Sequence, residues 1–331
     1  TTGEPKPIAL TLEMVEQRAL AAGKLWRGRD AFLCVLNSSS ASGFHTFISC
    51  LQEGLPFLVS GNVRENLKLI HKNAVAAIKA SPFQIRELLE EGQKLGYSLD
   101  SLKVIYSAGA AVPFDLVKIV EDKGTIALHN LYGSSEAGRG AERELASSDL
   151  SWVGHVVPGT TLQIVDEHDN EVATGQIGSV RYRRDHQAVE YFGEPELSAK
   201  VFKDGWFYTG DLGRIDSEGR LFLEGRTSRI MNIAGVKINP ELVVQNILAR
   251  AGIVDAVAFE HRPDYGQNEF GVAVQVSNAI DFESLALELK QAFGPAAPQI
   301  LFNVPELPRN SAGKPVSAKV AELYAKALQQ N

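Results

Sequence analysis

Short apolar segments alternate with helix-like segments from Ala31 to Leu128. The apolar segments are rich in β-branched residues, which predicts buried strands. The predicted strands are Ala31–Leu36, Leu55–Val59, Ala74–Ile78, Leu102–Tyr106 and Thr125–Leu128. The helices predicted between them are Phe44–Gln52, Val63–Lys72, Pro82–Leu95 and Phe114–Asp122. This alternation is typical of a doubly wound parallel sheet with helices on both faces, in which ligands bind beyond the carboxyl ends of the strands.

The helix predicted after Ser81 has the clearest start signal. Ser81 is a good N-cap, Pro82 suits the first turn, and Gln84 completes a capping box. Together these features stabilise a helix start by about 1 kcal/mol.

The pattern changes near Ser151. From there to Leu223 strands and turns alternate, as in Leu162–Val165, Gly178–Tyr182 and a hairpin around Asp216–Gly219. This predicts a small β-barrel-like subdomain or a sandwich.

Beyond Arg226 a third pattern mixes strands with helices and predicts an α+β unit. Its strands and helices are expected at Val254–Glu260, Phe270–Val276, Pro240–Ala251 and Phe282–Phe293. We therefore predict an α/β protein in three parts. They are a partial doubly wound α/β subdomain over 1–150, a β-rich subdomain over 151–226, and an α+β C-terminal domain over 227–331.

The composition and net charge exclude some classes of binding partner. The 331 residues carry 33 basic and 40 acidic side chains, a net charge of −7, which argues against nucleic acid or an anionic membrane as partner. No apolar run approaches the roughly 20 residues that span a bilayer. Cys34 and Cys50 have neither metal-site spacing nor a disulfide framework, so we expect buried thiols and a reducing, cytoplasmic location.

A series of motifs suited to phosphate and ribose follows along nearly the whole chain. They are Thr1–Lys6, Tyr132–Glu136, Gly205–Asp211, Gly225–Arg226 with Gly235–Lys237, and Pro308–Lys314. In the first, the hydroxyls of Thr1 and Thr2, the backbone at Gly3 and the charge of Lys6 together suit a phosphate. The carboxylate of Asp211 suits the two hydroxyls of a ribose.

The order of these motifs resembles the adenylate-forming superfamily of acyl- and aryl-CoA ligases, carrier-loading adenylation domains and firefly luciferase. The resemblance covers the second half of that superfamily's large domain and its C-terminal domain. It implies that residues 1–150 form a nucleotide-binding subdomain and 227–331 a mobile lid. It also implies ATP or AMP, Mg²⁺, and coenzyme A or a carrier-protein phosphopantetheine as ligands.

The resemblance assigns roles within residues 132–136. Tyr132 is expected to stack on adenine beside Gly133 and Ser134, Ser135 to contact phosphate, and Glu136 to hold Mg²⁺. Ser135 stands where the superfamily prefers threonine and keeps the hydroxyl. Mg²⁺ suits this task because it takes hard oxygen ligands and bridges phosphate oxygens.

Further roles follow from the same resemblance. Gly109, Ala110 and Ala111 end a predicted strand with small residues and match the adenine pocket, since a flat ring approaches small residues closely. Asp211 is expected to bind ribose. Arg226 is expected to contact ribose or phosphate and to begin the hinge.

In the C-terminal part, the loop with Gly235 and Lys237 leaves room for a pantetheine arm, and Lys314 bridges the substrate carboxylate and the α-phosphate by resemblance. Two segments depart from the superfamily pattern: Ser228 in the hinge, and Asn239–Val243, which has apolar residues where paired glutamates are usual. The motif at Thr1 is shorter than its counterparts, so we expect either a fragment of a longer chain or an impaired phosphate grip.

The resemblance predicts ATP-dependent activation of a small carboxylic acid to an acyl-adenylate, followed by thioester formation with CoA. Three alternatives stay open: a domain loading a carrier-protein pantetheine, a catalytically dead nucleotide-binding fragment, and a luciferase-like oxygenase. Asn37–Phe47 contains no carboxylate, which disfavours an α-amino acid and favours an acyl or aryl acid. His45 in this stretch either gates the acyl pocket or simply packs.

Overall fold

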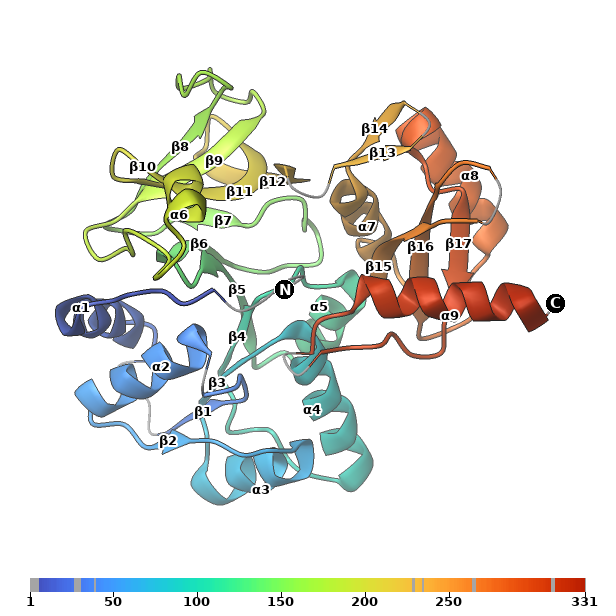
Figure 1. Cartoon of the computed structure of the whole chain (residues 1–331). Helices are drawn as coiled ribbons and strands as arrows, with labels where there is room; N and C mark the ends of the chain where they lie inside the picture. The colour runs from blue at the N-terminus through green and yellow to red at the C-terminus, as the bar shows by residue number, and fades with distance from the viewer. Residues whose placement is uncertain are drawn as a thin grey trace. The chain divides into compact units, whose positions relative to one another are not determined.

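The computed structural model describes residues 6–26, 31–38, 40–227, 230–233, 235–263, 266–310 and 313–330 (Figure 1). The chain forms two units. Unit 1 comprises Thr1–Ala110 and Val120–Leu223, and unit 2 comprises Ala111–Ile119 and Glu224–Asn331. The boundaries predicted at 150 and 226 stay predictions.

Unit 1 contains the predicted parallel sheet. Its strands pair in the order β2-β1-β3-β4-β5, all parallel. They are β1 (Phe32–Cys34), β2 (Phe57–Leu58), β3 (Ala77–Ala80), β4 (Val104–Ala108) and β5 (Ala127–Ser134). The helices between them are α2 (Ala41–Gln52), α3 (Val63–Asn73), α4 (Pro82–Leu95) and α5 (Phe114–Glu121), whose first residues belong to unit 2. The α/β fold expected from the alternating pattern is therefore confirmed.

Helix α4 begins and ends where the sequence predicts. Ser81 caps it through the backbone N–H of Gln84, and the Gln84 side chain accepts from the Ser81 N–H, so the capping box is complete. Gly96 ends the helix in a left-handed conformation with φ of 72°, which favours glycine.

Helix α1 (Leu12–Gly23) is an element that the sequence analysis does not predict. Thr11 caps it, and it packs along α2 (Figure 1). Beneath these two helices lies an apolar cluster in which Trp26, Phe32 and Cys50 are fully buried. The ring centroids of Trp26 and Phe32 lie 4.6 Å apart. Burying one such side chain contributes about 2–3 kcal/mol to the stability of the fold.

The β-rich segment continues the same sheet in antiparallel fashion. From β5 the order runs β6-β7-β12-β11-β9-β8, with β10 beside β11, which makes twelve strands in the described residues. The added strands are β6 (Gly138–Glu144), β7 (Gly154–Val156), β8 (Thr161–Val165), β9 (Gly178–Arg183), β10 (Phe202–Lys203), β11 (Trp206–Ile215) and β12 (Arg220–Arg226). A short helix, α6 (Pro195–Val201), precedes β10. The hairpin expected around Asp216–Gly219 joins β11 to β12.

Unit 2 is an α+β structure around the sheet β15-β16-β17. Its described elements are β13 (Met231–Ile233), β14 (Val236–Ile238), α7 (Pro240–Leu248), β15 (Ile253–His261), β16 (Glu269–Val276), α8 (Phe282–Phe293), η2 (Gly294–Ala296), β17 (Ile300–Asn303) and α9 (Ser317–Gln330). Phe259 and Phe270 are fully buried on this sheet. Gly271 is required there, because an added Cβ would lie 2.5 Å from the Phe259 ring. None of the helices in the described ranges is long and apolar enough to cross a membrane.

Candidate active site

The motif at residues 132–136 occupies the hairpin between β5 and β6. Tyr132, Gly133 and Ser134 end β5, whereas Ser135 and Glu136 lie in the turn. Gly133 faces the backbone of β6 so closely that an added Cβ would lie 2.4 Å from the Gly138 carbonyl oxygen. The strand register also shifts between Tyr132 and Gly133. A glycine is therefore needed for this hairpin to close.

The turn that carries Glu136 is clamped by Arg18 of α1. The guanidinium donates to the carbonyl oxygens of Ser135 at 2.9 Å, Glu136 at 2.6 Å and His186 at 2.6 Å. Burial lowers the pKa of Arg18 to about 10, so the group stays charged at neutral pH. The Ala188 N–H donates to the same Glu136 carbonyl at 2.8 Å. The backbone of this turn is thus fixed from two directions.

The Glu136 carboxylate is half-buried and accepts a hydrogen bond from the Tyr191 hydroxyl at 2.6 Å. Lys6 contacts the ring of that tyrosine, with its ammonium 5.3 Å from the ring centroid. The chain beside Lys6 is held by an N–H of Phe192, which donates to the Pro7 carbonyl at 2.8 Å. A lysine and a carboxylate from distant segments therefore meet around one tyrosine.

Asp211 and Tyr132, 79 residues apart, are joined directly. The Tyr132 hydroxyl donates to Asp211 Oδ2 at 2.5 Å. Burial, and then the Asp211 charge, raise the pKa of Tyr132 well above its ordinary value, so the hydroxyl keeps its proton. The Asp211 N–H donates to Thr209 Oγ1 at 3.0 Å, and this hydroxyl donates to the Val180 carbonyl at 3.0 Å. Two predicted nucleotide ligands thus share one hydrogen bond across the sheet.

The remaining residues predicted for the nucleotide site lie at or just after the ends of β4 and β5, and the last of them, Ala111, is counted with unit 2. Ser134 Oγ is 3.1 Å from the Tyr182 hydroxyl and accepts from the Ala137 N–H, so it points into the hairpin, whereas Ser135 is exposed. Three exposed small residues follow the end of β4; they are Gly109, Ala110 and Ala111. The first of them has a φ of 93°, which favours glycine. Thr1, Thr2 and Gly3 lie outside the described residues.

The residues predicted in unit 2 occupy turns and strand ends. Arg226 ends β12, Gly235 with φ of 83° lies in the turn before β14, and Lys237 is exposed on β14. Lys314 follows a tight turn in which its N–H donates to Asn310 Oδ1 at 3.0 Å, while the Asn310 N–H donates back to the Lys314 carbonyl. Ser228 of the predicted hinge lies outside the described residues.

The Lys314 turn is anchored to the sheet of unit 2. Arg309 forms an ion pair with Asp255 of β15 at 2.7 Å and donates to the Gly313 carbonyl at 3.0 Å. The backbone of the lysine is therefore held on a rigid element.

The turn around Glu136 suits a single Mg²⁺ ligand rather than a complete metal cage. Across the described ranges no group of three or more His, Cys, Asp or Glu side chains gathers as a metal site. Mg²⁺ bound through one protein carboxylate takes its other ligands from phosphates and water. The half-buried carboxylate of Glu136, with Lys6 nearby for phosphate charge, fits that arrangement.

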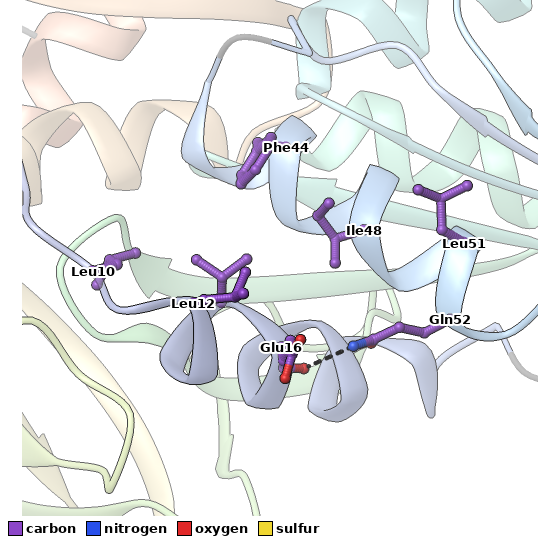
Figure 2. Close-up of a pocket in the computed structure, with 8 residues that line it drawn as sticks. Leu10, Leu12, Glu16, Phe44, Ile48, Leu51 and Gln52 are labelled. Carbon is purple, nitrogen blue, oxygen red and sulfur yellow. Dashed lines mark hydrogen bonds between the residues drawn. The ribbon is translucent and has the colours of Figure 1, made fainter.

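An apolar groove lies elsewhere, between α1 and α2. It has a volume of about 600 Å³ and is open to the surface (Figure 2). It is lined by Leu10, Leu12, Val15, Glu16, Phe44, Ile48, Leu51 and Gln52. The Gln52 side chain donates to the Glu16 carbonyl across it at 3.3 Å. None of the predicted site residues lines this groove.

His45 on α2 packs with one nitrogen satisfied. Its Nδ1 lies 2.6 Å from the Ala41 carbonyl oxygen, so Nδ1 donates and Nε2 is an acceptor in the neutral ring. Burial lowers the pKa of His45, which favours that neutral form. Nε2 is buried and has no hydrogen-bond partner among the described residues.

Sequence reasoning misses Arg18, Tyr191 and the helix that carries Arg18. A signal for α1 exists, because Thr11 is a good N-cap and Leu12, Val15, Ala19 and Ala22 repeat at helical spacing. No sequence signal marks Tyr191 as the partner of Glu136.

Known proteins with related sequences are acid ligases. A medium/long-chain-fatty-acid–CoA ligase, FadD8 of Mycobacterium tuberculosis, is 27% identical over 336 residues, which cover 95% of this chain and 58% of that protein. An indoleacetate–CoA ligase of Aromatoleum aromaticum is 29% identical and covers 74% of this chain and 49% of that protein. A medium/long-chain-fatty-acid–[acyl-carrier-protein] ligase, FadD10 of M. tuberculosis, is 25% identical. The match covers 97% of this chain and 64% of that protein. The chain thus spans about half to two thirds of the length of these relatives.

The fold is also that of solved adenylate-forming enzymes. The anthranilate CoA ligase AuaEII in complex with anthranoyl-AMP superimposes with a TM-score of 0.84 at 20% identity, over 99% of this chain and 67% of that one. The amide bond synthetase McbA from Marinactinospora thermotolerans gives 0.83 at 24% identity, over 98% and 68%. The model of the family described as AMP-binding enzyme matches residues 1–192, more than half of the chain. The chain therefore belongs to the AMP-binding enzyme family.

Proposed function

We propose that this chain carries out AMP-forming ligation of a small carboxylic acid to a thiol. A carboxylate oxygen attacks the α-phosphorus of ATP, the bond to the pyrophosphate oxygen breaks, and an acyl-adenylate forms. The sulfur of a thiol then attacks the acyl carbon, and the bond to AMP breaks, giving a thioester while the thiol proton passes to solvent. The observation that carries the proposal is the meeting of Tyr132, Asp211 and the clamped Glu136 turn in a chain of this family.

Each of these groups has a role that its chemistry suits. Asp211, already aligned by Tyr132, accepts hydrogen bonds from ribose hydroxyls. Glu136 would hold Mg²⁺, which neutralises phosphate charge when it is bound. Lys6, which contacts the tyrosine bonded to Glu136, and the exposed Ser135 beside it in sequence would bind the same phosphates.

Lys314 supplies the positive charge for the adenylation step in this proposal. Two anions, the substrate carboxylate and the α-phosphate, must approach each other, and a cation between them lowers the barrier. Arg226–Arg229 is the proposed hinge. A swing about it would replace Lys314 with the Gly235 turn for the second step, so that water does not reach the adenylate.

CoA is the proposed thiol, because FadD8 and the indoleacetate ligase are named as CoA ligases. A carrier-protein phosphopantetheine is the second candidate, favoured by the FadD10 match over 97% of the chain. We place the chemistry in the cytoplasm, and the two free, buried cysteines suit a reducing compartment.

The test is an ATP-dependent pyrophosphate-release assay over a panel of carboxylic acids, with CoA or a carrier protein as acceptor. We expect release with at least one acid and thioester with one acceptor. Binding of ATP without pyrophosphate release from any acid would support the catalytically dead alternative. Oxygen uptake with the adenylate would support the luciferase-like one.

A variant test separates the two half-reactions. Lys314→Ala should lower adenylate formation about 100-fold or more, because a preorganised cation is lost, while thioester formation from supplied adenylate falls only slightly. Lys319→Ala, an exposed lysine on α9, is the matched control. Equal loss of both half-reactions in Lys314→Ala would contradict the role proposed for this lysine.

A further inference from the structure

Four polar side chains form a row across the parallel strands of unit 1. Cys34 on β1 pairs with Lys79 on β3, Lys79 pairs with Tyr106 on β4, and Tyr106 pairs with His129 on β5. Residues in register share one face of a sheet, so these four side chains lie on the same face. We call them the polar row. Helix α2 covers this face, because Cys50 of α2 packs in the same cluster as Cys34 and Tyr106.

Lys79 is a buried cation without a countercharge. Its side chain is 9% exposed, and its ammonium donates to Thr46 Oγ1 at 3.3 Å and lies 6.0 Å from the centre of the Trp26 ring. No described carboxylate forms an ion pair with it. Burial of a charge without a partner is costly, so proteins retain such a group where a ligand or a function requires it.

The titratable groups around Lys79 do not balance its charge. Burial raises the pKa of the Cys34 and Cys50 thiols, which therefore stay neutral, and the Arg139 charge opposes that of the lysine. Burial is also the main reason that the pKa of Lys79 falls to about 8, so the amine is still mostly protonated at neutral pH.

One polar atom without a partner belongs to the ring near this ammonium, and two more lie on α2, the helix that covers the row. Trp26 Nε1, whose ring lies next to the ammonium, and Ser49 Oγ, on the buried face of α2 with Thr46, have no hydrogen-bond partner among the described residues. His45 Nε2 on the same helix is an unpartnered acceptor. Buried polar groups are normally paired, and a cluster of exceptions needs an explanation. Trp26 Nε1 can only donate and the Ser49 hydroxyl can donate, so an acceptor or an anion would satisfy these two atoms as well as the ammonium.

A short ligand would span the distance between the polar row and the candidate nucleotide site. His129 and Tyr132 are three residues apart on β5, so they lie roughly 10 Å apart along the strand and their side chains leave it on opposite faces. Leu131, the neighbour of Tyr132, belongs to the same apolar cluster as Cys34 and Tyr106, so the face that carries the row extends to the strand end beside Tyr132. Both sites lie toward the carboxyl ends of the parallel strands, where ligands of such sheets bind. A molecule with two anionic ends about that far apart would reach both.

We propose that the polar row binds a second anionic group, a carboxylate, at the far end of the acid that is activated at the nucleotide site. This inference rests on the proposed function and names its substrate class, a short dicarboxylic acid. Lys79 supplies the countercharge, and the Trp26 N–H is a further donor to the same group.

The test compares acids that differ only in the distal group. Pentanedioate and pentanoate, and hexanedioate and hexanoate, form matched pairs for titration calorimetry and pyrophosphate release. We expect the diacid of at least one pair to bind about tenfold or more tightly than its monoacid and to give the higher kcat/KM, because a charged hydrogen bond to Lys79 forms only with the diacid. Similar affinities within both pairs would overturn the proposal.

Variants separate recognition from a structural role. Lys79→Met should remove the preference for the diacid while keeping or improving use of the monoacid. Lys123→Met, an exposed lysine of the same unit, should leave the preference unchanged. A loss of the same size for both acids in Lys79→Met would mean that Lys79 is only structural.

Binding is measured independently of catalysis. In protein labelled with ¹³C and ¹⁵N at lysine, the Lys79 side-chain resonance should shift on adding pentanedioate or hexanedioate but not the monoacids. This shift without pyrophosphate release would support the row and contradict the proposed function. Pyrophosphate release with monoacids, and no shift of the Lys79 resonance with either diacid, would support the proposed function and contradict the binding proposed for the row.

Discussion

The nucleotide edge, made of Tyr132, Glu136 and Asp211, and the polar row are both polar, yet they differ in how their groups are satisfied. At the edge, Tyr132 donates to Asp211 and Tyr191 donates to Glu136. In the row, Tyr106 donates to the Leu25 carbonyl at 2.6 Å, but Lys79 has one neutral partner, and Trp26 Nε1 near it has none in the described part of the chain. Protein contacts preorganise the edge, whereas the row, in our proposal, is completed by a ligand. Substitutions should therefore cost stability or activity at the edge and increase stability at the row.

The largest expected effect is at the edge. Glu136→Gln keeps the shape of the side chain but removes its charge, and pyrophosphate release should fall about 100-fold, as when one preorganised electrostatic contact is lost. Release rates measured against Mg²⁺ concentration check this. Tyr191→Phe, which leaves the carboxylate in place, should cost less. A fall of equal size in both variants would mean that the hydrogen bond, not the charge, matters at this turn.

The next effect is a gain of stability in the row. Lys79→Met should stabilise the folded chain by up to about 3 kcal/mol at pH 7, because the pKa of this buried lysine falls from about 10.5 to about 8 on folding. Below pH 8 the amine is charged in both states and its burial cost is complete. Between pH 8 and 10.5 the folded state loses the proton before the unfolded state does. The unfolding free energy of the wild-type chain therefore rises relative to that of the variant as the pH increases.

Urea unfolding of both chains at pH 7 and near pH 10.5 checks this pH dependence. The gain from Lys79→Met should be largest at pH 7 and vanish at the higher pH. A variant that is less stable than the wild-type chain at pH 7 would show that protein contacts already stabilise the Lys79 charge. The row would then not differ from the edge in this respect.

A smaller loss is expected for Tyr132→Phe. It removes a hydrogen bond to a carboxylate, which is worth about 1.5–3 kcal/mol, and leaves Asp211 less well aligned. Urea unfolding measures the stability, and calorimetry with AMP measures the weaker binding. Tyr97→Phe, a tyrosine that contacts the His71 ring, is the control and should change neither quantity. Unchanged stability in Tyr132→Phe would show that the edge is not preorganised by this bond.

The smallest effect compares two positions on one face of α2. Ser49→Ala removes a buried hydroxyl without a partner, so the unfolding free energy should stay within about 1 kcal/mol of the wild-type value or rise. Thr46→Ala removes the hydroxyl that donates to the Ser42 carbonyl and accepts from Lys79, and should cost more. Thermal unfolding of the two variants ranks them, and the reverse order would contradict the assignment of unpartnered groups to this face.

Local signals predict much of the fold. Helix α4 is predicted with both ends correct, because Ser81, Pro82 and Gln84 act within a few residues of each other. The strand expected at Ala74–Ile78 is observed as β3, Ala77–Ala80, and so includes Lys79. A lysine in the sequence argues against a buried strand. The predicted strand therefore ends at Ile78, just before Lys79, although Lys79 is buried in the observed strand.

The site is less predictable because its contacts are long-range. The motifs identify Tyr132 and Asp211 separately, but their hydrogen bond depends on the strand order β5-β6-β7-β12-β11, which no local pattern gives. The elements α1, β17 and α9 are likewise observed but not predicted. Arg18 belongs to the same class, since a guanidinium that binds three carbonyl oxygens leaves no trace in its own sequence neighbourhood.

The three carbonyl oxygens bound by Arg18 give helix α1 an importance out of proportion to its apolar contacts. Removal of this helix, by proteolysis or by deletion, would leave the Ser135 carbonyl to water and the Glu136 carbonyl with only the Ala188 N–H, while the backbone pairing of β5 and β6 does not involve α1. Such a protein would still give the circular dichroism expected of an α/β sheet. The turn that carries Glu136, however, would have lost one of the two contacts that set its position.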